Sequence, residues 1–188
     1  MDDSPAAVVS VGTAAGRTFD WSSRLGVASA IAEALAFMHN ELREDCIAHG
    51  NLKSSNILFN KNMEPSISEY GLMTIDNSAY SPLTNNTFQP FNSDQNESAF
   101  RADIHALGVI LLVSVVKEEW TVEVFDRALV REGASEERIV NLLQVAIKCV
   151  DRSPGSRPSI NQVAVMINNI KEDERSMDVS ESPFSMRI

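Results

Sequence analysis

The feature that most constrains the fold is a run of apolar residues at helical spacing between residues 21 and 43. Its apolar positions are Leu25, Ala28, Ile31, Ala32, Leu35, Met38 and Leu42. Steps of three and four place them on one face of a helix, and that face must be buried against other elements. Asp20 stands before the run, where its carboxylate can accept hydrogen bonds from the free amides of the first turn. The pattern therefore predicts a long helix that begins after Asp20.

Three later segments predict further helices. Residues 101–116 are hydrophobic on most sides, which is typical of a central helix, although a strand is an alternative for the β-branched end of this segment. Residues 135–150 carry an apolar stripe on one face. A last helix is expected from Ser159, because Ser159 and Gln162 form a capping-box pattern.

Short strands and polar loops separate the first two helices. A polar loop at residues 46–56 leads into an apolar run at 57–59, and a second short run follows at 66–68, which together predict a small hairpin. Residues 73–98 contain few apolar side chains and many Asn, Ser and Thr. A loop of that length is uncommon in a compact domain and is usually functional or disordered.

The two ends of the chain differ in composition from its middle. Residues 1–18 are rich in small side chains and predict a flexible N-terminal segment, whereas residues 172–188 are charged and Ser-rich and predict a disordered tail. Residues 19–171 then form one domain. A chain of 188 residues is long enough for such a domain to have a hydrophobic core.

Charge and hydropathy exclude several classes of protein. The formal net charge of −10, with no run of Lys or Arg, argues against nucleic acid as a partner. The most apolar segment, residues 106–116, is shorter than the roughly 20 residues that span a bilayer. The first residues lack the basic and then apolar pattern of a signal peptide. We therefore expect neither secretion nor a membrane span in this chain.

The two cysteines, Cys46 and Cys149, do not have the spacing of a metal site. Neither lies at a ligand-like distance in sequence from the other or from the three histidines. We expect both to be reduced thiols of an intracellular protein.

One polar loop carries the chemistry-bearing residues. The segment "AHGNLKSSNILF" (residues 48–59) places His49, Lys53 and Asn56 at fixed offsets before an apolar run. A loop of this kind can hold polar groups above a core. Where a reaction would need a carboxylate, however, the loop has Asn51.

Four motifs in order resemble the protein-kinase domain. "HGNLKSSN" (49–56) resembles the catalytic loop H-R-D-L-K-x-x-N, and "SEYGL" (68–72) resembles the metal-binding turn S-D-F-G-L. "RADIHALGV" (101–109) resembles the start of the central helix of the C-terminal lobe. "CVDRSPGSRPS" (149–159) resembles a late segment of plant receptor-like kinases.

The amino acids within these motifs are similar to those of one group of kinases. "HGNLKSSNILF", "SEYGL" and "EEWTVEVFD" (118–126) are similar to plant leucine-rich-repeat receptor-like kinases of the type called inactive. The resemblance implies a mainly α fold, namely the helical C-terminal lobe with a short β-hairpin. Nothing before Phe19 resembles the glycine-rich loop, the strand Lys or its Glu partner, so we expect the N-terminal lobe to be absent.

The resemblance also assigns roles at the site. In phosphoryl transfer the catalytic-loop Asp accepts a proton from the attacking hydroxyl, and the loop Asn and the turn Asp hold magnesium ions. Asn51 stands at the position of that base, and an amide does not take up a proton near neutral pH. Losing a positioned base costs about 10²–10⁴ in rate. Lys53 matches the family pattern as a phosphate contact, and Asn56 and Glu69 stand at the cofactor and metal positions.

Three further residues are expected to be structural. His49 is predicted to pack within the loop, and Asp103 is predicted to accept hydrogen bonds from backbone amides of residues 48–51. Arg157 matches a position that pairs with a Glu in the family, but no A-P-E sequence follows the long loop. We expect Arg157 to face solvent or to have a new partner, for which Glu97 is a candidate.

These observations predict a catalytically impaired pseudokinase that works as a signalling or protein-interaction module. ATP and magnesium are implied by resemblance only, and we expect neither to bind tightly. Expected partners are other receptor kinases or signalling proteins, with a location in the cytoplasm or at the cytoplasmic face of the plasma membrane. Two alternatives stay open: a serine/threonine kinase that uses ATP and magnesium within a complete two-lobed parent, and a truncated product that folds poorly.

Overall fold

The computed structural model describes residues 13–14, 17–42, 47–70, 93–115 and 135–180. Its longer helices are α1 (Trp21–Glu41), α3 (Ser93–Val115), α5 (Glu136–Cys149) and α6 (Ile160–Ser180). Its strands are β1 (Thr13–Ala14), β2 (Arg17–Thr18), β3 (Ile57–Phe59) and β4 (Pro65–Ile67), and its 3-10 turns are η1 (Ser54–Asn56) and η2 (Pro154–Ser156). The described part is therefore mainly α, as predicted.

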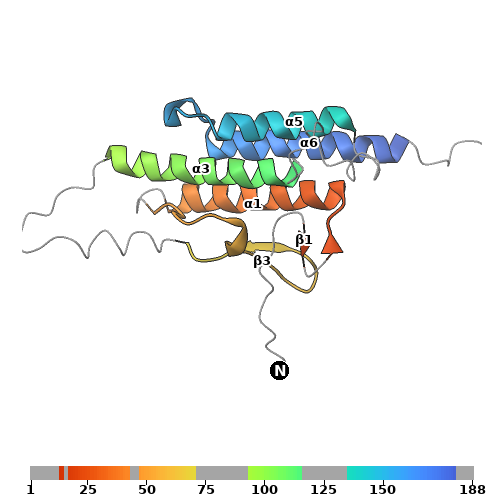
Figure 1. Ribbon diagram of the computed structural model, residues 1–188, viewed down its shortest axis with the longest axis horizontal. Helices are drawn as coiled ribbons and strands as arrows, with labels where there is room; N and C mark the ends of the chain where they lie inside the picture. The colour runs from red at the N-terminus through yellow and green to blue at the C-terminus, as the bar shows by residue number, and fades with distance from the viewer. Residues whose placement is uncertain (1–12, 15–16, 43–46, 71–92, 116–134, 181–188) are drawn as a thin grey trace, which may run out of the picture.

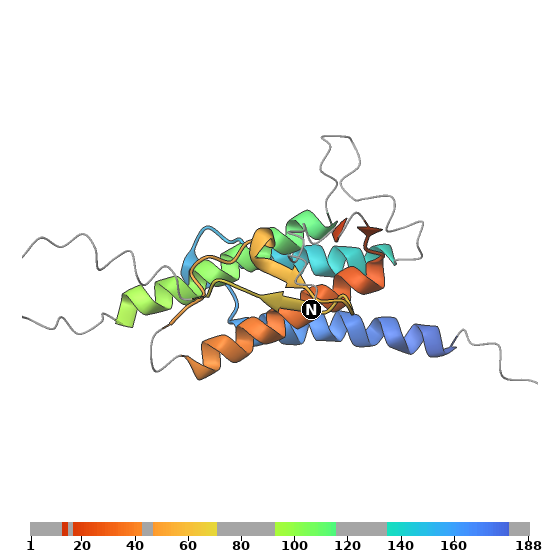
Figure 2. The ribbon, with the colours of Figure 1, turned by 90° about the horizontal axis from the view of Figure 1, so that it is seen from below.

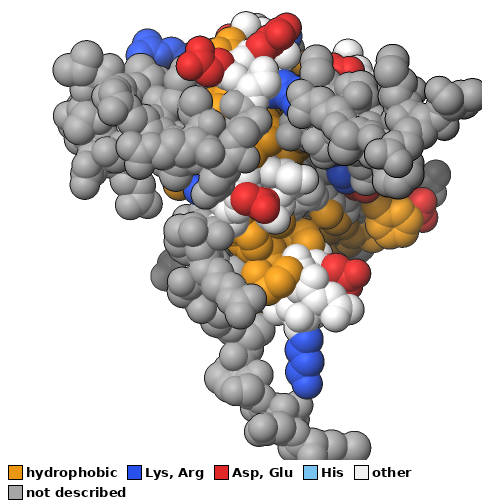
Figure 3. Space-filling model, turned by 90° about the vertical axis from the view of Figure 1, so that its right-hand side faces the viewer, with side chains coloured by type: hydrophobic (Ala, Val, Ile, Leu, Met, Phe, Trp, Pro, Cys, Tyr) orange, Lys and Arg blue, Asp and Glu red, His pale blue; other side chains and the backbone are white. Residues whose placement is uncertain are grey.

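The helices stack in layers with the hairpin on one side. Helix α1 packs mainly against α6, and α3 mainly against α5. Figure 1 shows the β3–β4 hairpin beyond α1, on the side away from α5 and α6. Figure 2 shows the hairpin in front of the helices when the molecule is seen from below. Figure 3 looks onto one end of the molecule, where hydrophobic side chains lie among acidic and basic ones.

The start of α1 confirms the predicted cap. The carboxylate of Asp20 accepts a hydrogen bond from the backbone N–H of Ser23 at 2.8 Å. Hydrogen bonds from Ser23 lower the pKa of Asp20, because they stabilise the charged form. The helix ends at Glu41, slightly before the predicted end at residue 43.

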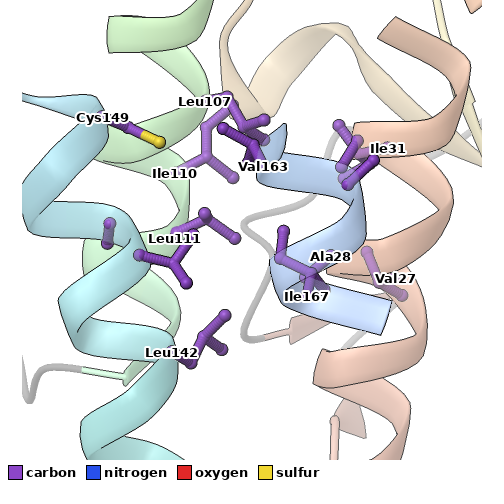
Figure 4. Packing of buried hydrophobic residues seen from close by; sticks show 14 of the residues in the cluster. Val27, Ala28, Ile31, Leu107, Ile110, Leu111, Leu142, Cys149, Val163 and Ile167 are labelled. Atoms are coloured by element: carbon purple, nitrogen blue, oxygen red, sulfur yellow. The ribbon is translucent and has the colours of Figure 1, made fainter. Parts of the chain in front are cut away.

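The core is formed by the facing stripes of four helices. Figure 4 shows side chains from all four meeting in one cluster. The labelled members are Val27, Ala28, Ile31, Leu107, Ile110, Leu111, Leu142, Cys149, Val163 and Ile167. Burying one of the Val, Leu or Ile side chains among them contributes roughly 1.5–3 kcal/mol relative to exposing it. The apolar periodicity of the helices therefore corresponds to one main core, and Phe19 forms a small separate cluster with Phe59 and Met63.

Gly108 allows α3 and α5 to approach closely. A Cβ atom placed on Gly108 would lie 2.6 Å from Cβ of Cys149 and 2.8 Å from a methyl carbon of Val150. No side chain fits in that space without moving the α5 backbone. Cys149 itself is a buried free thiol, and burial raises its pKa to about 12.

Helix α3 is the central helix that its composition predicts, but it begins earlier. It starts at Ser93, so residues 93–98 are helical rather than part of the predicted 73–98 loop. Polar residues are compatible with the exposed end of a helix, and Glu97 pairs with Arg101 one turn later at 2.9 Å. The remaining loop residues, 73–92, lie outside the described part. The strand alternative for the end of this segment is wrong, since α3 is helical to Val115.

Helix α3 is longer than the apolar segment of residues 106–116 that was compared with the length of a membrane span. The window Glu97–Val115 is long and apolar enough to cross a bilayer by composition alone, which the predicted helix was not. Leu107, Leu111 and Val115 from this window are buried in the protein core. Less than half of the window is buried inside the protein, and no other helix of the described residues meets the criterion.

The hairpin begins at the predicted residue and has a fixed register. Strand β3 pairs antiparallel with β4, with Ile57 opposite Ile67 and Phe59 opposite Pro65. The side chain of Asn60 accepts from the backbone N–H of Asn62 at 2.9 Å and closes the turn. Strand β4 lies one residue earlier than predicted, because Ser68 bonds to a loop residue rather than to β3.

Both ends of the chain contain more regular structure than predicted. Helix α6 begins with the predicted capping box, in which the backbone N–H of Ser159 donates to Gln162 at 2.8 Å, but it continues to Ser180. The predicted tail is therefore helical as far as residue 180, and the Glu, Arg and Met residues at its start favour a helix. Within the predicted flexible segment, β1 and β2 pair as a short antiparallel ribbon.

Buried polar contacts join the helices in addition to the apolar core. The guanidinium of Arg24 donates to the backbone oxygen of Phe19 at 2.8 Å and to that of Ser114 at 2.9 Å. The hydroxyl of Ser29 on α1 donates to Asn168 on α6 at 2.7 Å. These contacts fix the start of α1 against the end of α3, and α1 against α6.

Candidate functional site

The candidate site is the loop of residues 48–56, and a buried carboxylate on α3 anchors it. Asp103 is 1% exposed, and its two oxygens accept from the backbone N–H groups of His49 at 2.7 Å and Gly50 at 2.8 Å. The sequence analysis predicts such bonds. Gly50 has φ of 74°, a left-handed value that glycine adopts without steric cost.

A histidine on α1 completes the surroundings of Asp103. Nε2 of His39 lies 3.0 Å from an oxygen of Asp103, and the imidazole stacks edge-on against Phe100 at 4.7 Å between ring centroids. An ionised carboxylate only accepts hydrogen bonds, so His39 donates from Nε2. His39 was not among the site residues predicted from the sequence. Its signal was available, since His39 falls on the apolar face one turn after Leu35.

His49 is enclosed in the loop and has one nitrogen without a partner. Its Nδ1 accepts from the backbone N–H of Asn51 at 3.2 Å, so a neutral ring carries its proton on Nε2. Nε2 is buried and has no hydrogen-bond partner among the described residues. Burial lowers the pKa of His49, and the nearby charge of Asp103 opposes that shift only in part. A neutral, packed His49 fits the structural role predicted for it.

Asn51 faces Glu69 across the site. The side-chain amide of Asn51 donates from Nδ2 to Oε2 of Glu69 at 3.3 Å. Glu69 is exposed and follows β4 in a left-handed backbone conformation, with φ of 61°. Left-handed conformations are uncommon for residues other than glycine and often occur at functional sites. The side chain at the expected base position therefore forms a hydrogen bond with the side chain at the expected metal-binding position.

The buried side chain of Asn56 connects two parts of the loop by a hydrogen bond. It is 4% exposed, and its side chain donates from Nδ2 to the backbone oxygen of Asn51 at 2.8 Å. The backbone oxygen of Asn56 accepts from the N–H and the hydroxyl of Ser68, at 2.8 and 3.0 Å. These bonds connect the loop to the residue before Glu69.

Lys53 is apart from this network. Its side chain is exposed and makes no hydrogen bond or ion pair with another described residue. It borders a groove of about 360 Å³ between the loop and α3. The groove is lined by Leu52, Lys53, Ser54, His105, Ala106, Val109, Ile110 and Val113.

Arg157 lies outside this network, and its partner is not Glu97. Its guanidinium donates to the backbone oxygens of Asp151 at 2.9 Å and Arg101 at 2.8 Å. The candidate partner Glu97 instead pairs with Arg101, because the two are one helical turn apart. Arg157 is thus re-paired with main-chain oxygens, and the proposed pairing with Glu97 is wrong.

The structure therefore brings five of the predicted residues into one network. These residues are His49, Asn51, Asn56, Glu69 and Asp103. Groups that could touch a metal are Glu69 and the side-chain oxygen of Asn56. Among the described residues, no cluster of three or more His, Cys, Asp or Glu side chains is arranged to hold a metal ion.

Comparison with known proteins gives relatives over most of the chain. No protein-family model matches it. It is 31% identical to a "Probable leucine-rich repeat receptor-like protein kinase" of Arabidopsis thaliana, over 83% of this chain and 27% of the relative. It is 30% identical to a "Probable inactive receptor kinase" of the same plant, over 85% of this chain and 29% of the relative. The chain thus spans less than a third of the length of these relatives.

Solved structures share the fold. The pseudokinase domain of BIR2, described as an immune regulator of the RLK/Pelle family, matches with a TM-score of 0.61 and 24% identity. The pseudokinase DRIK1, described as a drought responsive inactive kinase, matches with a TM-score of 0.61 and 17% identity. Each match covers 87% of this chain and 57% of the solved chain.

Proposed function

This chain is a homologue of plant leucine-rich-repeat receptor-like kinases, with the fold of their kinase domain, and from that premise we propose that it is a catalytically impaired pseudokinase module. In this proposal it acts by contact with other proteins rather than by phosphoryl transfer. The observation that carries the proposal is the amide of Asn51, which stands at the base position and donates to Glu69.

The chemistry of that amide supports the proposal. A general base must accept a proton, and an amide nitrogen that donates a hydrogen bond has no lone pair available for one. His49 does not replace the base, because its Nδ1 already accepts from Asn51 and its Nε2 is buried. In the described part of the loop, no other side chain has the position and the basicity that proton transfer requires.

The scaffold around the amide supports a role in binding. Asp103 holds the loop with two backbone hydrogen bonds whether or not a reaction takes place there. A loop with a fixed shape presents the same surface to a partner at all times, which reduces the entropy lost on association. The intact scaffold and the lost base together favour a protein-interaction module.

Cofactors, partners and location are part of the same proposal. We expect ATP and magnesium not to bind tightly, and we expect partners among other receptor kinases or signalling proteins. The expected location is the cytoplasm or the cytoplasmic face of the plasma membrane. The solved relative described as an immune regulator is one case in which a pseudokinase domain of this fold has a regulatory role.

A phosphotransfer assay tests the proposal. The full 188-residue chain is incubated with radiolabelled ATP, magnesium and a generic protein substrate, beside a Lys53→Ala variant. We expect no transfer above background from either protein. Turnover by the wild type that disappears in Lys53→Ala would contradict the proposal, because Lys53 is the cation of the described loop that is exposed and able to contact a phosphate.

A serine/threonine kinase within a longer parent is the second candidate. It is favoured by the exposed ammonium group of Lys53, which makes no hydrogen bond or ion pair within the described residues, and by the carboxylate that Glu69 provides next to the loop. The test is Asn51→Asp in a two-lobed parent. A gain in phosphoryl transfer together with a nucleotide-dependent thermal shift would support this candidate, and the absence of both would remove it.

A further inference from the structure

Helix α3 has a second apolar face that the core does not cover. Leu107 and Leu111 are fully buried, whereas Val109 and Val113 are 43% and 47% exposed. Successive residues of a helix are about 100° apart, so the two valines lie on nearly the opposite side of α3 from the two leucines. A helix that is hydrophobic on most sides is usually covered on most sides. The exposed face of α3 therefore has the composition of a covered one.

This face forms one wall of the groove beside the 48–56 loop. The groove has a volume of about 360 Å³, and it is lined by Val109 and Val113 from α3 and by Leu52 and Lys53 from the loop. Clefts that bind ligands have volumes of about 300–1,000 Å³ and mostly apolar walls with a few polar groups. The groove is at the small end of that range, so it fits one or two bulky side chains rather than a whole helix.

Lys53 gives the groove its positive charge. The ammonium group is exposed and makes no hydrogen bond or ion pair with another described residue. The described residues that line the groove include no Asp or Glu, although the chain has 26 acidic residues against 16 Lys and Arg. A cation of this kind beside an apolar wall is complementary to an apolar ligand that carries a negative charge.

The number of basic side chains narrows the class of ligand. Phosphorylated motifs are usually bound by clusters of Arg, and anionic membranes by clusters of several Lys or Arg. The groove has one Lys and no Arg among its described lining residues, with His105 and Ser54 as its other polar side chains. One carboxylate next to apolar side chains matches this set.

A second copy of the chain fits the groove less well. In a two-fold dimer the same patch faces itself, so Lys53 of one copy would lie near Lys53 of the other. Each copy also has a formal net charge of −10, which opposes association. These charges favour a different protein as the occupant.

We propose that the groove between Lys53 and the exposed face of α3 binds a short peptide segment of a partner protein, in which one or two bulky apolar side chains stand next to an Asp or Glu. The apolar side chains pack on Val109 and Val113, and the carboxylate pairs with Lys53. This inference rests on the proposed function, because it gives the chemistry of a partner for the protein-interaction module.

Selection from a random-peptide library tests the chemistry of the ligand. Short peptides displayed on phage are selected on the immobilised full chain, and those that also bind a Lys53→Glu variant are discarded. We expect the enriched peptides to share an Asp or Glu next to bulky apolar residues. Enrichment of basic peptides, or of none that distinguish the two proteins, would overturn the proposal.

Matched variants then locate the binding site. The dissociation constant of an enriched, fluorescently labelled peptide is measured by fluorescence anisotropy. Lys53→Glu should weaken binding about threefold or more, because an ion pair becomes a repulsion. Lys61→Glu makes the same change in the exposed turn of the hairpin and should have no effect.

A second pair of variants tests the apolar wall. Val109→Asn should weaken binding about tenfold, because it removes an apolar contact at the centre of the groove. Val165→Asn is the control, at a position of α6 that is 58% exposed and does not line this groove, and it should bind as the wild type does. Equal losses in Val109→Asn and Val165→Asn would overturn the proposal. All four substituted positions are exposed, and circular dichroism checks that each variant folds.

A charge exchange tests the assigned ion pair. The same peptide is synthesised with Lys in place of its acidic residue. This peptide should bind Lys53→Glu more tightly than it binds the wild type. A preference for the wild type would overturn the pairing of the carboxylate with Lys53.

Failure of this inference is distinguishable from failure of the proposed function. If no peptide binds the groove and the phosphotransfer assay shows no turnover, the inference is wrong and the pseudokinase module stands. If the wild type transfers phosphate to protein, the proposed function is wrong whether or not a peptide binds.

Discussion

The buried and exposed sides of the 48–56 loop are held in different ways. On the buried side, Asp103 is almost fully enclosed and accepts at 2.7 and 2.8 Å from two backbone amides. On the exposed side, Asn51 reaches Glu69 at 3.3 Å, and Lys53 has no partner among the described residues. The hydrogen bonds that shape the loop are thus on its buried side, whereas Asn51 and Glu69, the two departures from the kinase pattern, meet on its exposed side. The shape of the loop and its departures from the pattern therefore depend on different atoms.

The largest test of this comparison removes the buried anchor. Asp103→Ala leaves His39, the buried amide of His49 and the partly buried amide of Gly50 without an acceptor, and breaking a buried pair such as His39–Asp103 costs about 3–5 kcal/mol. The free energy of unfolding in urea measures the effect. Asp151→Ala is the matched control, since Asp151 accepts from the amide of Ser153 at 2.8 Å but is exposed. Equal losses in both variants would contradict the importance of burial.

The packing of α3 gives the next largest effect. Gly108→Ala places a methyl group 2.6 Å from Cβ of Cys149, and overpacking a core in this way costs about 1–3 kcal/mol. Gly26→Ala is the control within α1, where no atom lies within 4 Å of an added Cβ. That variant should gain about 0.5–1 kcal/mol, because Ala favours a helix over Gly. Urea unfolding should therefore separate the two variants by sign.

The cap of α1 tests an exposed hydrogen bond with a defined structural role. Asp20→Ala should cost about 1 kcal/mol near neutral pH. The pKa of Asp20 is lower in the folded state than in the unfolded chain, so its contribution is present above the unfolded value. The contribution is lost as the pH falls through the folded value. Urea titrations at neutral and acidic pH should therefore show the difference between wild type and variant shrinking upon acidification.

The smallest effect is expected at the exposed chemical position. Lys53→Ala should change the free energy of unfolding by less than about 0.5 kcal/mol, because Lys53 is exposed and its ammonium group makes no hydrogen bond or ion pair with a described residue. The same urea measurement applies. A loss larger than that of Asp20→Ala would show that Lys53 has a structural role, and the comparison between the two sides of the loop would fail.

The sequence predicted the helices better than the contacts between them. Apolar periodicity placed α1, α5 and the core of α3, and cap residues such as Asp20 and Ser159 marked where helices begin. Each of these signals is local, so it is visible in a short window of residues. The start of α3 and the end of α6 were missed, because polar residues are compatible with both a loop and a solvated helix end.

The candidate site shows the same limit. The order of the motifs assigned both the loop and the turn after β4 to the site. The predicted hydrogen bonds from backbone amides of the loop to Asp103 are present in the structure. The contact between Asn51 and Glu69 was not predicted, because each was compared with the family pattern separately. The partners of Arg157 were not predicted either, since main-chain oxygens leave no trace in a sequence.

The hydrogen-bond partners of Arg157 determine how the contact between α3 and the turn before α6 responds to substitution and to pH. Arg157 donates to the carbonyl of Arg101, and Arg101 donates to the carbonyl of Arg157. A carbonyl of the peptide chain has no side chain to mutate and no proton to gain in acid. These two acceptors therefore remain when a substitution or a fall in pH would remove a carboxylate acceptor. Only substitution of Arg101 or Arg157, the two donors, would remove these hydrogen bonds.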